Sequence, residues 1–307
     1  MNEKFTIVIV TYNRLELLKE CIQSAFNQTL RPYKVVVVDN ASTDGTGVYL
    51  AEQEKIFDNL IVDTSPSNLG GAGGFHRGLE VASLESSDWV VLIDDDAMLC
   101  SEYLETIAKY SSLMPNVKAF SGTVMTDGVV ITDHRKRIYK GWHGHEEKVS
   151  EVEYKQDSFE YDLSSFCGIT IHQSIIDAIG LPMKDFFIWC DDTEYSLRIR
   201  KETSIVNINS IWLNHKTKLN SVSVSEYSSR LNWKRYYGFR NKTFTCLKYG
   251  YKAYIVKYDL RAIKHIISLK LHKKVEADIC DYNLHMVMRG VLDGVKGKLG
   301  KNPKYIP

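Results

Sequence analysis

Short runs of β-branched and aliphatic residues that end on polar side chains constrain the fold of this chain more than any other feature. Three of them are clear, at Phe5–Val10, Lys34–Asp39 and Trp89–Ile93. Continuous apolar runs of this length are typical of strands buried on both faces of a parallel sheet. Between the first two, apolar residues recur at helical spacing from Leu15 to Phe26. This alternation predicts a doubly wound α/β sheet whose ligand crevice lies at the carboxyl ends of the strands.

The pattern changes after residue 115. We expect further strands at Val117–Met125, Leu163–Ile171 and Ile205–Leu213, a helix from Asp191, and a polar loop or flap over residues 133–158. From about Glu226 to Gly297 the chain is predicted to be helical, with breaks near Gly250 and His272. The sequence therefore predicts a catalytic α/β domain over residues 1–225 and a helical C-terminal region over residues 226–307.

Charge is distributed unevenly along the 307 residues. Residues 228–307 hold 18 Lys and Arg against 5 Asp and Glu, a net charge of +13, although the whole chain carries only +1. Arg235, Tyr236, Tyr237, Phe239, Arg240 and Lys242 mix basic and aromatic groups as interfacial helices do. This region is predicted to contact a membrane surface, with a solvated face or a homo-oligomer contact as alternatives. No DNA- or RNA-reading motif is present, so nucleic acid is not expected as a partner.

Cysteine usage and hydropathy indicate the compartment. The six cysteines are scattered and form no CxxC pair, which fits free thiols in a reducing environment. We find no export signal at the N-terminus and no apolar stretch near the roughly 20 residues that a membrane span needs. The expected location is the cytoplasm, peripheral to the inner face of the cell membrane.

Three adjacent carboxylates, Asp94–Asp96, directly follow the strand Trp89–Ile93. Their mutual repulsion is relieved by a hard divalent cation with oxygen ligands, which can also bridge to a diphosphate. A solvated acidic turn is the alternative interpretation. The position at the carboxyl end of a buried strand favours the metal.

Two further motifs contain candidate catalytic and metal-binding residues. Asp191 and Asp192 lie in the first turn of a predicted helix, where the helix dipole keeps a carboxylate ionised and suits it to act as a general base. Simple capping, with an ion pair between Glu194 and Arg198, is the alternative. His215 follows the strand Ile205–Leu213. A lone histidine is usually structural, but the triplet needs a further ligand, and imidazole suits Mn²⁺ better than Mg²⁺.

A glycine-rich stretch from Asn68 to Gly78 leads into another predicted helix. It does not match the dinucleotide-binding fingerprint, because His76 stands at the third glycine position. We interpret the glycines as allowing a ligand to approach the backbone closely. Arg77 could meet a phosphate there, or it could be an ordinary surface arginine.

Five sequence blocks in order resemble glycosyltransferase family 2. They are TYNR at 11–14, VVVVDNASTDGT at 35–46, NLGGAGGFHRGL at 68–79, LIDDDAM at 92–98 and WCDDTEYSLR at 189–198. The resemblance implies the GT-A fold, which binds nucleotide sugars, and covers about 200 residues. Within the family, the sequence more closely resembles bacterial galactofuranosyltransferases, and rhamnosyltransferases of the same family are the alternative. After residue 220 only the pair Arg240-Asn241 looks familiar.

The resemblance also implies roles for particular residues. The residues implied to bind the nucleotide sugar are Thr11, Tyr12, Asn13, Asp39, Asn68, Arg77, Asp94, Asp95 and Trp189. The residues implied to bind the metal, Mn²⁺ or Mg²⁺, are Asp94, Asp96 and His215. Asp192 corresponds to the catalytic base, and Asp191 stands where relatives have a glutamate.

The reaction implied is an inverting transfer, in which Asp192 takes the proton of the acceptor hydroxyl. Galactofuranose from UDP-galactofuranose is the expected donor group, and UDP is favoured over dTDP. The expected acceptor is a polyprenyl-linked glycan in cell-surface polysaccharide synthesis. A dTDP-rhamnose-dependent rhamnosyltransferase and a nucleotide-sugar-binding protein without transfer activity are the alternatives.

Overall fold

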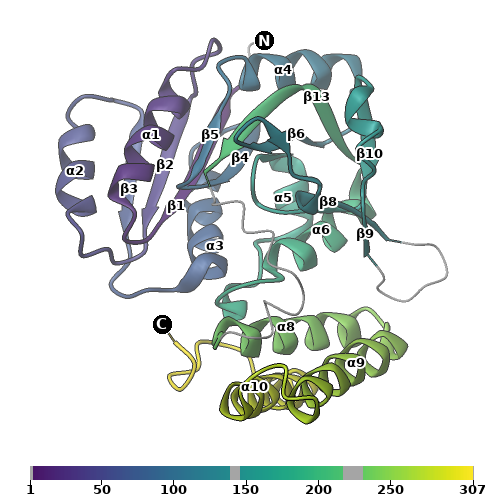
Figure 1. Ribbon diagram of the computed structural model, residues 1–307. Helices are drawn as coiled ribbons and strands as arrows, with labels where there is room; N and C mark the ends of the chain where they lie inside the picture. Colours follow the sequence, from purple (N-terminus) through teal and green to yellow (C-terminus); the bar gives the residue numbers. More distant parts are fainter. Residues whose placement is uncertain (1–2, 139–145, 217–230, 307) are drawn as a thin grey trace. The chain divides into compact units, whose positions relative to one another are not determined.

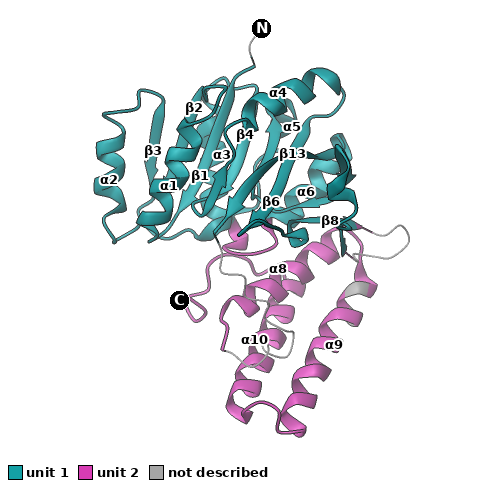
Figure 2. Ribbon diagram, turned by 45° about the horizontal axis from the view of Figure 1, so that its top comes forward, with its two compact units in different colours: residues 1–137, 147–184, 192–218 teal, residues 138–146, 185–191, 219–307 magenta. Residues whose placement is uncertain are grey.

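The computed structural model describes residues 3–138, 146–216 and 231–306, and the chain divides into two compact units (Figure 2). The first comprises residues 1–137, 147–184 and 192–218, and the second residues 138–146, 185–191 and 219–307. The domain boundary predicted at residues 225 and 226 lies outside the described residues.

A ten-stranded mixed sheet forms the centre of the first unit (Figure 1). Its main path runs β10-β13-β6-β12-β4-β1-β2-β3. These strands are β1 Phe5–Thr11, β2 Lys34–Asp39, β3 Leu60–Thr64, β4 Trp89–Asp94, β6 Ala119–Thr126, β10 Ser158–Tyr161, β12 Ile169–His172 and β13 Ile205–His215. Off this path, β5 (Ala97–Leu99) pairs with β13 and β7 (Val129–Val130) with β6. A small second sheet is ordered β11-β8-β9, from Leu163–Ser164, Arg135–Ile138 and Glu146–Lys148.

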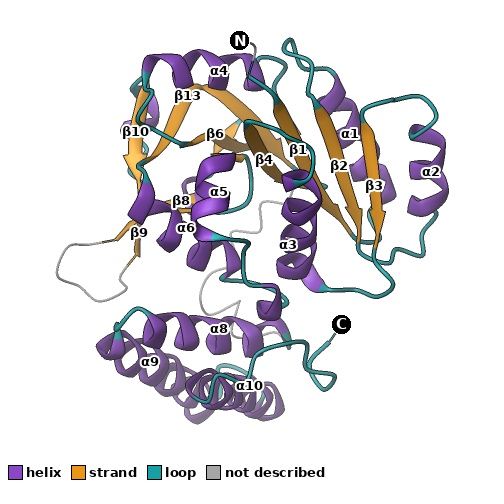
Figure 3. Cartoon of the chain, turned by 180° about the vertical axis from the view of Figure 1, so that it is seen from behind, coloured by secondary structure: helices purple, strands orange, loops and turns teal. Residues whose placement is uncertain are grey.

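The predicted parallel core is confirmed, because β4, β1, β2 and β3 are parallel neighbours. Every residue of β1 is buried. Its side chains alternate between two apolar clusters, Ile7 and Ile9 on one face and Val8 and Val10 on the other. Helices α1 (Leu15–Phe26), α2 (Thr46–Gln53) and α4 (Tyr103–Leu113) cover the first face; α3 (Gly70–Ser83), α5 (Gln173–Ile179) and α6 (Asp191–Glu202) cover the second (Figures 1 and 3).

The prediction of one continuous strand over Leu163–Ile171 is wrong, because the structure has two strands there. The chain leaves β11 after Ser164 and enters β12 only at Ile169. Gly168 lies between them at φ 82°, and a Cβ there would lie 2.2 Å from a methyl group of Leu213. The break therefore depends on a glycine that can take a left-handed conformation in a tightly packed place.

The second unit contains three helices, α8 (Lys234–Lys248), α9 (Lys252–Leu271) and α10 (Ala277–Val295). The predicted breaks near Gly250 and His272 are thus confirmed. Helix α10 approaches α8 closely, because a Cβ on Gly290 or Gly294 would lie 2.5 or 2.4 Å from a backbone oxygen of α8. No helix within the described ranges is both long enough and apolar enough to cross a membrane.

The exposed basic and aromatic face predicted for residues 235–242 is wrong in this structure. Arg235, Tyr236, Tyr237 and Arg240 are all at most 4% exposed. The two tyrosines belong to an apolar cluster with Met286. Arg240 is buried because its guanidinium reaches several backbone carbonyl groups, which replace its hydration. The predicted membrane contact therefore cannot rest on these side chains.

Candidate functional site

Polar residues at the carboxyl ends of β1, β2 and β4 meet at one edge of the sheet. The parallel register pairs Thr11 with Asp39 across β1 and β2, and Val10 with Asp94 across β1 and β4. The Thr11 hydroxyl donates to Asp95 Oδ2 at 2.8 Å. The predicted donor-binding and metal-binding residues of these three strands therefore lie together.

Strand pairing brings His215 to the same edge from far along the chain. The turn after Asp94 leads directly into β5, which pairs with the end of β13 so that His215 lies opposite Ala97. The Nε2 atom of His215 then lies 3.2 Å from Asp96 Oδ1. The ring of His134, whose Nδ1 lies 2.7 Å from Ser165 Oγ, packs edge-on against His215.

Arg14 is a second cation beside the acidic turn. Its Nη1 donates to Asp95 Oδ1 at 3.1 Å and to Asp96 Oδ2 at 2.7 Å. The arginine side chain is 49% exposed, whereas the two carboxylates are almost fully buried. Arg14 therefore offsets part of the repulsion in the triplet from its solvent side.

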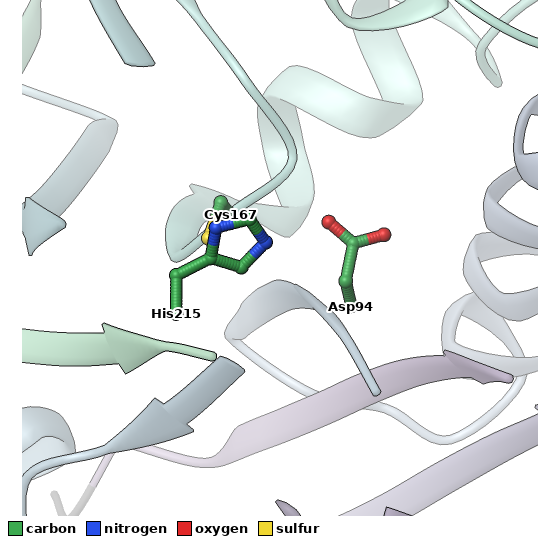
Figure 4. A group of neighbouring side chains, drawn as sticks. All are labelled: Asp94, Cys167 and His215. Atoms are coloured by element: carbon green, nitrogen blue, oxygen red, sulfur yellow. The ribbon is translucent and has the colours of Figure 1, made fainter. Parts of the chain in front are cut away.

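Three potential metal ligands converge here, Asp94 from β4, His215 from β13 and Cys167 from the loop before β12 (Figure 4). One ligand atom each from Asp94, Cys167 and His215 lies within 4.8 Å of the others. Asp96 Oδ1 is buried, and no described residue donates a well-aligned hydrogen bond to it. Carboxylate, imidazole and thiol groups around a buried oxygen with free lone pairs fit a divalent transition-metal ion such as Mn²⁺. The thiol makes the set softer than the all-oxygen ligands that Mg²⁺ prefers.

The electrostatics of the triplet differ from residue to residue. Burial, reinforced by the charge of Asp96 and partly offset by His215, raises the pKa of Asp94 to about 7. Burial, partly offset by Arg14, raises the pKa of Asp95 to about 6. Burial acts on Asp96 too, but contact with His215 and the charge of Arg14 hold its pKa below the usual value. Burial would lower the pKa of His215, yet the contact with Asp96 raises it. Contact between Asp96 and His215 therefore favours the charged form of each.

The loop after β2 is held against the end of β1. Asp39 is 1% exposed, and its Oδ1 accepts from the amide of Ser42 at 2.9 Å. Asn13, at φ 52°, accepts from the amide of Thr43 at 2.7 Å. At the start of α1, Asp44 accepts from the amide of Leu15 at 3.0 Å. Tyr12 stays 40% exposed beside this loop.

The glycine-rich stretch lies mostly inside α3 and serves the packing of that helix on the sheet. A Cβ on Gly74 would lie 2.4 Å from Val10 Cγ1, and one on Gly78 would lie 2.3 Å from Val8 Cγ1. These two glycines therefore let α3 approach β1. A Cβ on Gly71 would meet nothing within 4 Å, so close approach of a ligand remains a prediction for Gly71 alone.

Asn68 and Arg77, both predicted near the donor, make local contacts. Asn68 Oδ1 accepts from the amide of Gly70 at 2.7 Å, at the start of α3. Arg77 pairs with Asp63 at 2.8 Å and with Glu80 at 2.7 Å. Its side chain is 44% exposed. These contacts match the surface-arginine alternative, and its phosphate role stays a prediction.

The two carboxylates predicted for catalysis begin helix α6. Asp192 Oδ1 accepts from the amide of Thr193 at 2.6 Å, and burial raises the pKa of Asp192. Asp191 is 7% exposed. Glu194 and Arg198 form the predicted pair at 2.9 Å, but Glu194 is fully buried, so this is not a surface ion pair.

In the second unit, the segment before α6 has a strained backbone. Phe187, Trp189 and Cys190 have φ values of 63°, 66° and 68°. Such left-handed conformations of non-glycine residues cost about 1–3 kcal/mol each and persist only where the surroundings impose them. Trp189, predicted to contact the donor, is 37% exposed.

Comparison with known proteins identifies the family. The family model named Glycosyl transferase family 2 matches residues 6–166, which is more than half of the chain. The chain belongs to glycosyl transferase family 2. The matched part includes β1, β2 and β4 with the acidic turn.

Curated relatives include glycosyltransferases with different sugars. The poly(ribitol-phosphate) beta-glucosyltransferase of Bacillus spizizenii is 31% identical over 33% of this chain and 16% of its own. Galactofuranosyltransferase GlfT1 of Mycobacterium tuberculosis is 30% identical over 65% of each chain. The O-antigen chain rhamnosyltransferase RfbN of Salmonella typhimurium is 32% identical over 36% of this chain and 33% of its own. This chain thus spans less than two thirds of the length of each of these relatives.

Solved structures confirm the GT-A fold. GalNAc-T7, crystallised with UDP, GalNAc and Mn²⁺, superimposes with a TM-score of 0.63 at 13% identity, over 96% of this chain and 57% of its own. TarS 1–349 of S. aureus, in complex with UDP, gives 0.57 at 16% identity, over 96% and 82%. At these identities the likeness establishes the fold alone.

The sequence prediction missed two residues of this family member's acidic site. Arg14 belongs to the TYNR block, and its place directly after Thr11-Tyr12-Asn13 at a strand end was an available signal. Cys167 carried no such signal, because it lies in a segment predicted as an unbroken strand. Its thiol reaches Asp94 and His215 only through the break before β12.

Proposed function

We propose that this protein transfers a sugar from a UDP-sugar to an acceptor hydroxyl, with inversion and with a divalent metal ion. The observation that carries the proposal is the convergence of Asp94, Cys167 and His215 beside the end of β1, where Thr11 contacts the same acidic turn. The neighbours crystallised with UDP support a UDP donor. Family membership supports glycosyl transfer.

The metal is proposed to be Mn²⁺ in preference to Mg²⁺. Asp94, Asp96 and His215 would hold it, with Cys167 beside them. When bound, it would offset the negative charge that builds on the departing diphosphate. The residues of this chain prepare the site: Arg14 and His215 keep Asp96 ionised, and Thr11 fixes Asp95 by its hydrogen bond.

The proposed donor pocket lies at the ends of β1 and β2. Asp39 is buried with its Oδ1 bound to the Ser42 amide, so its second oxygen is available to a nucleoside. Tyr12 and Asn13 flank it, and the exposed ring of Tyr12 offers a surface for a base. Asn68, Arg77 and Trp189 remain proposed donor contacts that rest on the family resemblance.

Asp192 is the proposed general base. Thr193 binds its Oδ1, which fixes the carboxylate and leaves Oδ2 to accept the proton of the acceptor hydroxyl. A pKa raised by burial brings the group closer to the pH at which a base works best. Asp191, next to it, is the alternative base.

Galactofuranose is the proposed transferred sugar, supported by the likeness to GlfT1 over 210 residues. The shorter likeness to RfbN favours rhamnose from dTDP-rhamnose as the second candidate. The acceptor is proposed to be a polyprenyl-linked glycan at the inner membrane face, since the C-terminal 80 residues carry a net charge of +13.

The test is a screen of UDP- and dTDP-sugars, including UDP-galactofuranose, for nucleotide release with Mn²⁺ and after EDTA treatment. Asp192→Asn should keep UDP affinity and lower kcat by about 10²–10⁴-fold. Full activity in EDTA would contradict the metal, and near-normal turnover of the variant would contradict the base. UDP binding with no turnover on any donor would favour a binding protein.

A further inference from the structure

The segment from Asp185 to Cys190 leads into α6 and has an unusual backbone for its sequence. It contains no glycine, yet Phe187, Trp189 and Cys190 all have φ between 63° and 68°. L-residues rarely adopt this conformation, so something outside the segment must hold it. The holding contacts come from one turn of α8, within the second unit.

Asn241 makes most of these contacts with a single side-chain amide. Its Nδ2 donates to the carbonyl oxygens of Phe186, Ile188 and Trp189 at 2.9, 3.0 and 2.9 Å. The residue is fully buried. Three carbonyl groups in four consecutive residues can point to one amide only if the backbone between them curls tightly. The left-handed residues provide that curl.

Arg240 completes the arrangement and orients Asn241. Its Nη2 donates to the carbonyl oxygens of Asp185 and Phe186 at 3.1 and 2.9 Å. Its Nε donates to Asn241 Oδ1 at 2.8 Å, so the amide of Asn241 must turn its Nδ2 toward the segment. Burying a guanidinium is costly unless its donors are satisfied. The pair thus specifies one geometry of the segment.

The preceding turn of α8 shapes the other side of the segment. Gly238 lies under the indole of Trp189, where a Cβ would approach the ring to 2.8 Å. The ring of Tyr237 packs against Phe187 with centroids 5.0 Å apart. Hydrogen bonds and shape therefore fix the Trp189 side chain together with its backbone.

We propose that Arg240 and Asn241 are positioning residues for sugar transfer, which hold the backbone of residues 185–190 so that Trp189 and Asp191 are set for the reaction. This inference rests on the proposed function, because Asp192, the proposed base, follows Asp191 directly in the chain. Arg240 and Asn241 act through residues 185–190, and Trp189 in that segment is a proposed donor contact. Their loss should therefore lower turnover and weaken UDP binding to a smaller extent.

Asn241→Asp is the test variant, because it keeps the shape of the side chain and replaces three donated hydrogen bonds by repulsion between oxygens. Thr243→Val is the matched control. It lies on the same helix, is equally buried and loses a hydrogen bond to Asp259, but Thr243 makes no described hydrogen bond to residues 185–190. Gly238→Ala is a second test variant, which displaces Trp189 and keeps the hydrogen bonds.

Three measurements on full-length protein are compared: hydrogen exchange of the peptide covering residues 185–191, UDP affinity with Mn²⁺ by calorimetry, and kcat for UDP release from the best UDP-sugar. For Asn241→Asp we expect faster exchange, kcat lower by about 100-fold, the cost of a displacement near 1 Å, and a smaller loss of UDP affinity from the displaced Trp189. Gly238→Ala should lower kcat in the same direction. Thr243→Val should match wild type in exchange of this peptide and in kcat.

Unchanged exchange in Asn241→Asp would overturn the holding role. Faster exchange with wild-type kcat, or an equal loss of kcat in Thr243→Val, would overturn the positioning role. If wild-type protein releases UDP from no UDP-sugar, the proposed function fails and the positioning role fails with it. The exchange comparison would still show whether Asn241 holds the segment.

Discussion

Replacing Gly74 by alanine tests how closely α3 packs against β1, whose carboxyl end forms part of the proposed donor site. The added Cβ would lie 2.4 Å from Val10 Cγ1 and 3.3 Å from Asn40 Nδ2, so both neighbours must shift. Overpacking of this kind costs about 1–3 kcal/mol. Alanine in place of glycine regains about 0.5–1 kcal/mol of helix propensity. We therefore expect a net loss of about 1–2 kcal/mol in the free energy of unfolding.

The control is Gly71→Ala in the same helix, where the added Cβ would meet nothing within 4 Å. It should be neutral or stabilise the protein by up to about 1 kcal/mol. In thermal unfolding followed by circular dichroism, Gly74→Ala should lower Tm by about 2–8 °C, at roughly 2–4 °C per kcal/mol for a unit of this size. A Tm for Gly74→Ala at or above that of Gly71→Ala would refute the packing argument.

Three further predictions address the metal, the second unit and Arg77. Cys167→Ser should shift the ratio of Mn²⁺ to Mg²⁺ affinity toward Mg²⁺ by about tenfold, measured by calorimetry with UDP. Cys246→Ser, which changes a buried thiol of the second unit, should leave the ratio unchanged, and equal ratios in both variants would exclude a thiol contribution. Burial raises the pKa of Asp259 to about 7, so its contribution to stability is complete below about pH 4 and is lost between about pH 4 and pH 7. Asp259→Asn should remove this loss, which thermal melts between about pH 4 and pH 8 would show. Arg77→Ala tests the proposed phosphate contact: loss of that contact should weaken UDP affinity by about tenfold in calorimetry, whereas unchanged affinity would show that the guanidinium serves only Asp63 and Glu80.

The parallel core and the acidic site were predictable for the same physical reason. A run such as Trp89–Ile93 is apolar throughout because both of its faces are covered, and at its carboxyl end the chain leaves the apolar layers, where carboxylates can meet polar partners such as Thr11 and Arg14. Asp94–Asp96 and Thr11 could therefore be placed together from sequence alone. His215 was predicted by family resemblance, and the structure supplies the cause, because the antiparallel pairing of β5 with β13 sets its register.

The contacts that sequence reasoning missed depend on breaks and burial that no local pattern encodes. The segment around Cys167 has the composition of a strand, and only the packing of Gly168 against Leu213 interrupts it. Similarly, the glycines of α3 have the composition of a ligand-binding loop. Their frequency alone cannot show whether a ligand or a neighbouring strand approaches the backbone closely.

Arg240 shows most clearly where composition misleads. A basic residue among tyrosines on a predicted helix indicates an exposed, membrane-facing side, because a guanidinium is costly to bury alone. Here the strained segment presents the carbonyl oxygens of Asp185 and Phe186 to that guanidinium, and Asn241 shares the Phe186 oxygen and binds those of Ile188 and Trp189 as well. The cost of the left-handed residues and the cost of the buried cation are each offset by the same hydrogen bonds. Each feature satisfies hydrogen-bonding groups of the other, so neither could be predicted by considering one segment at a time.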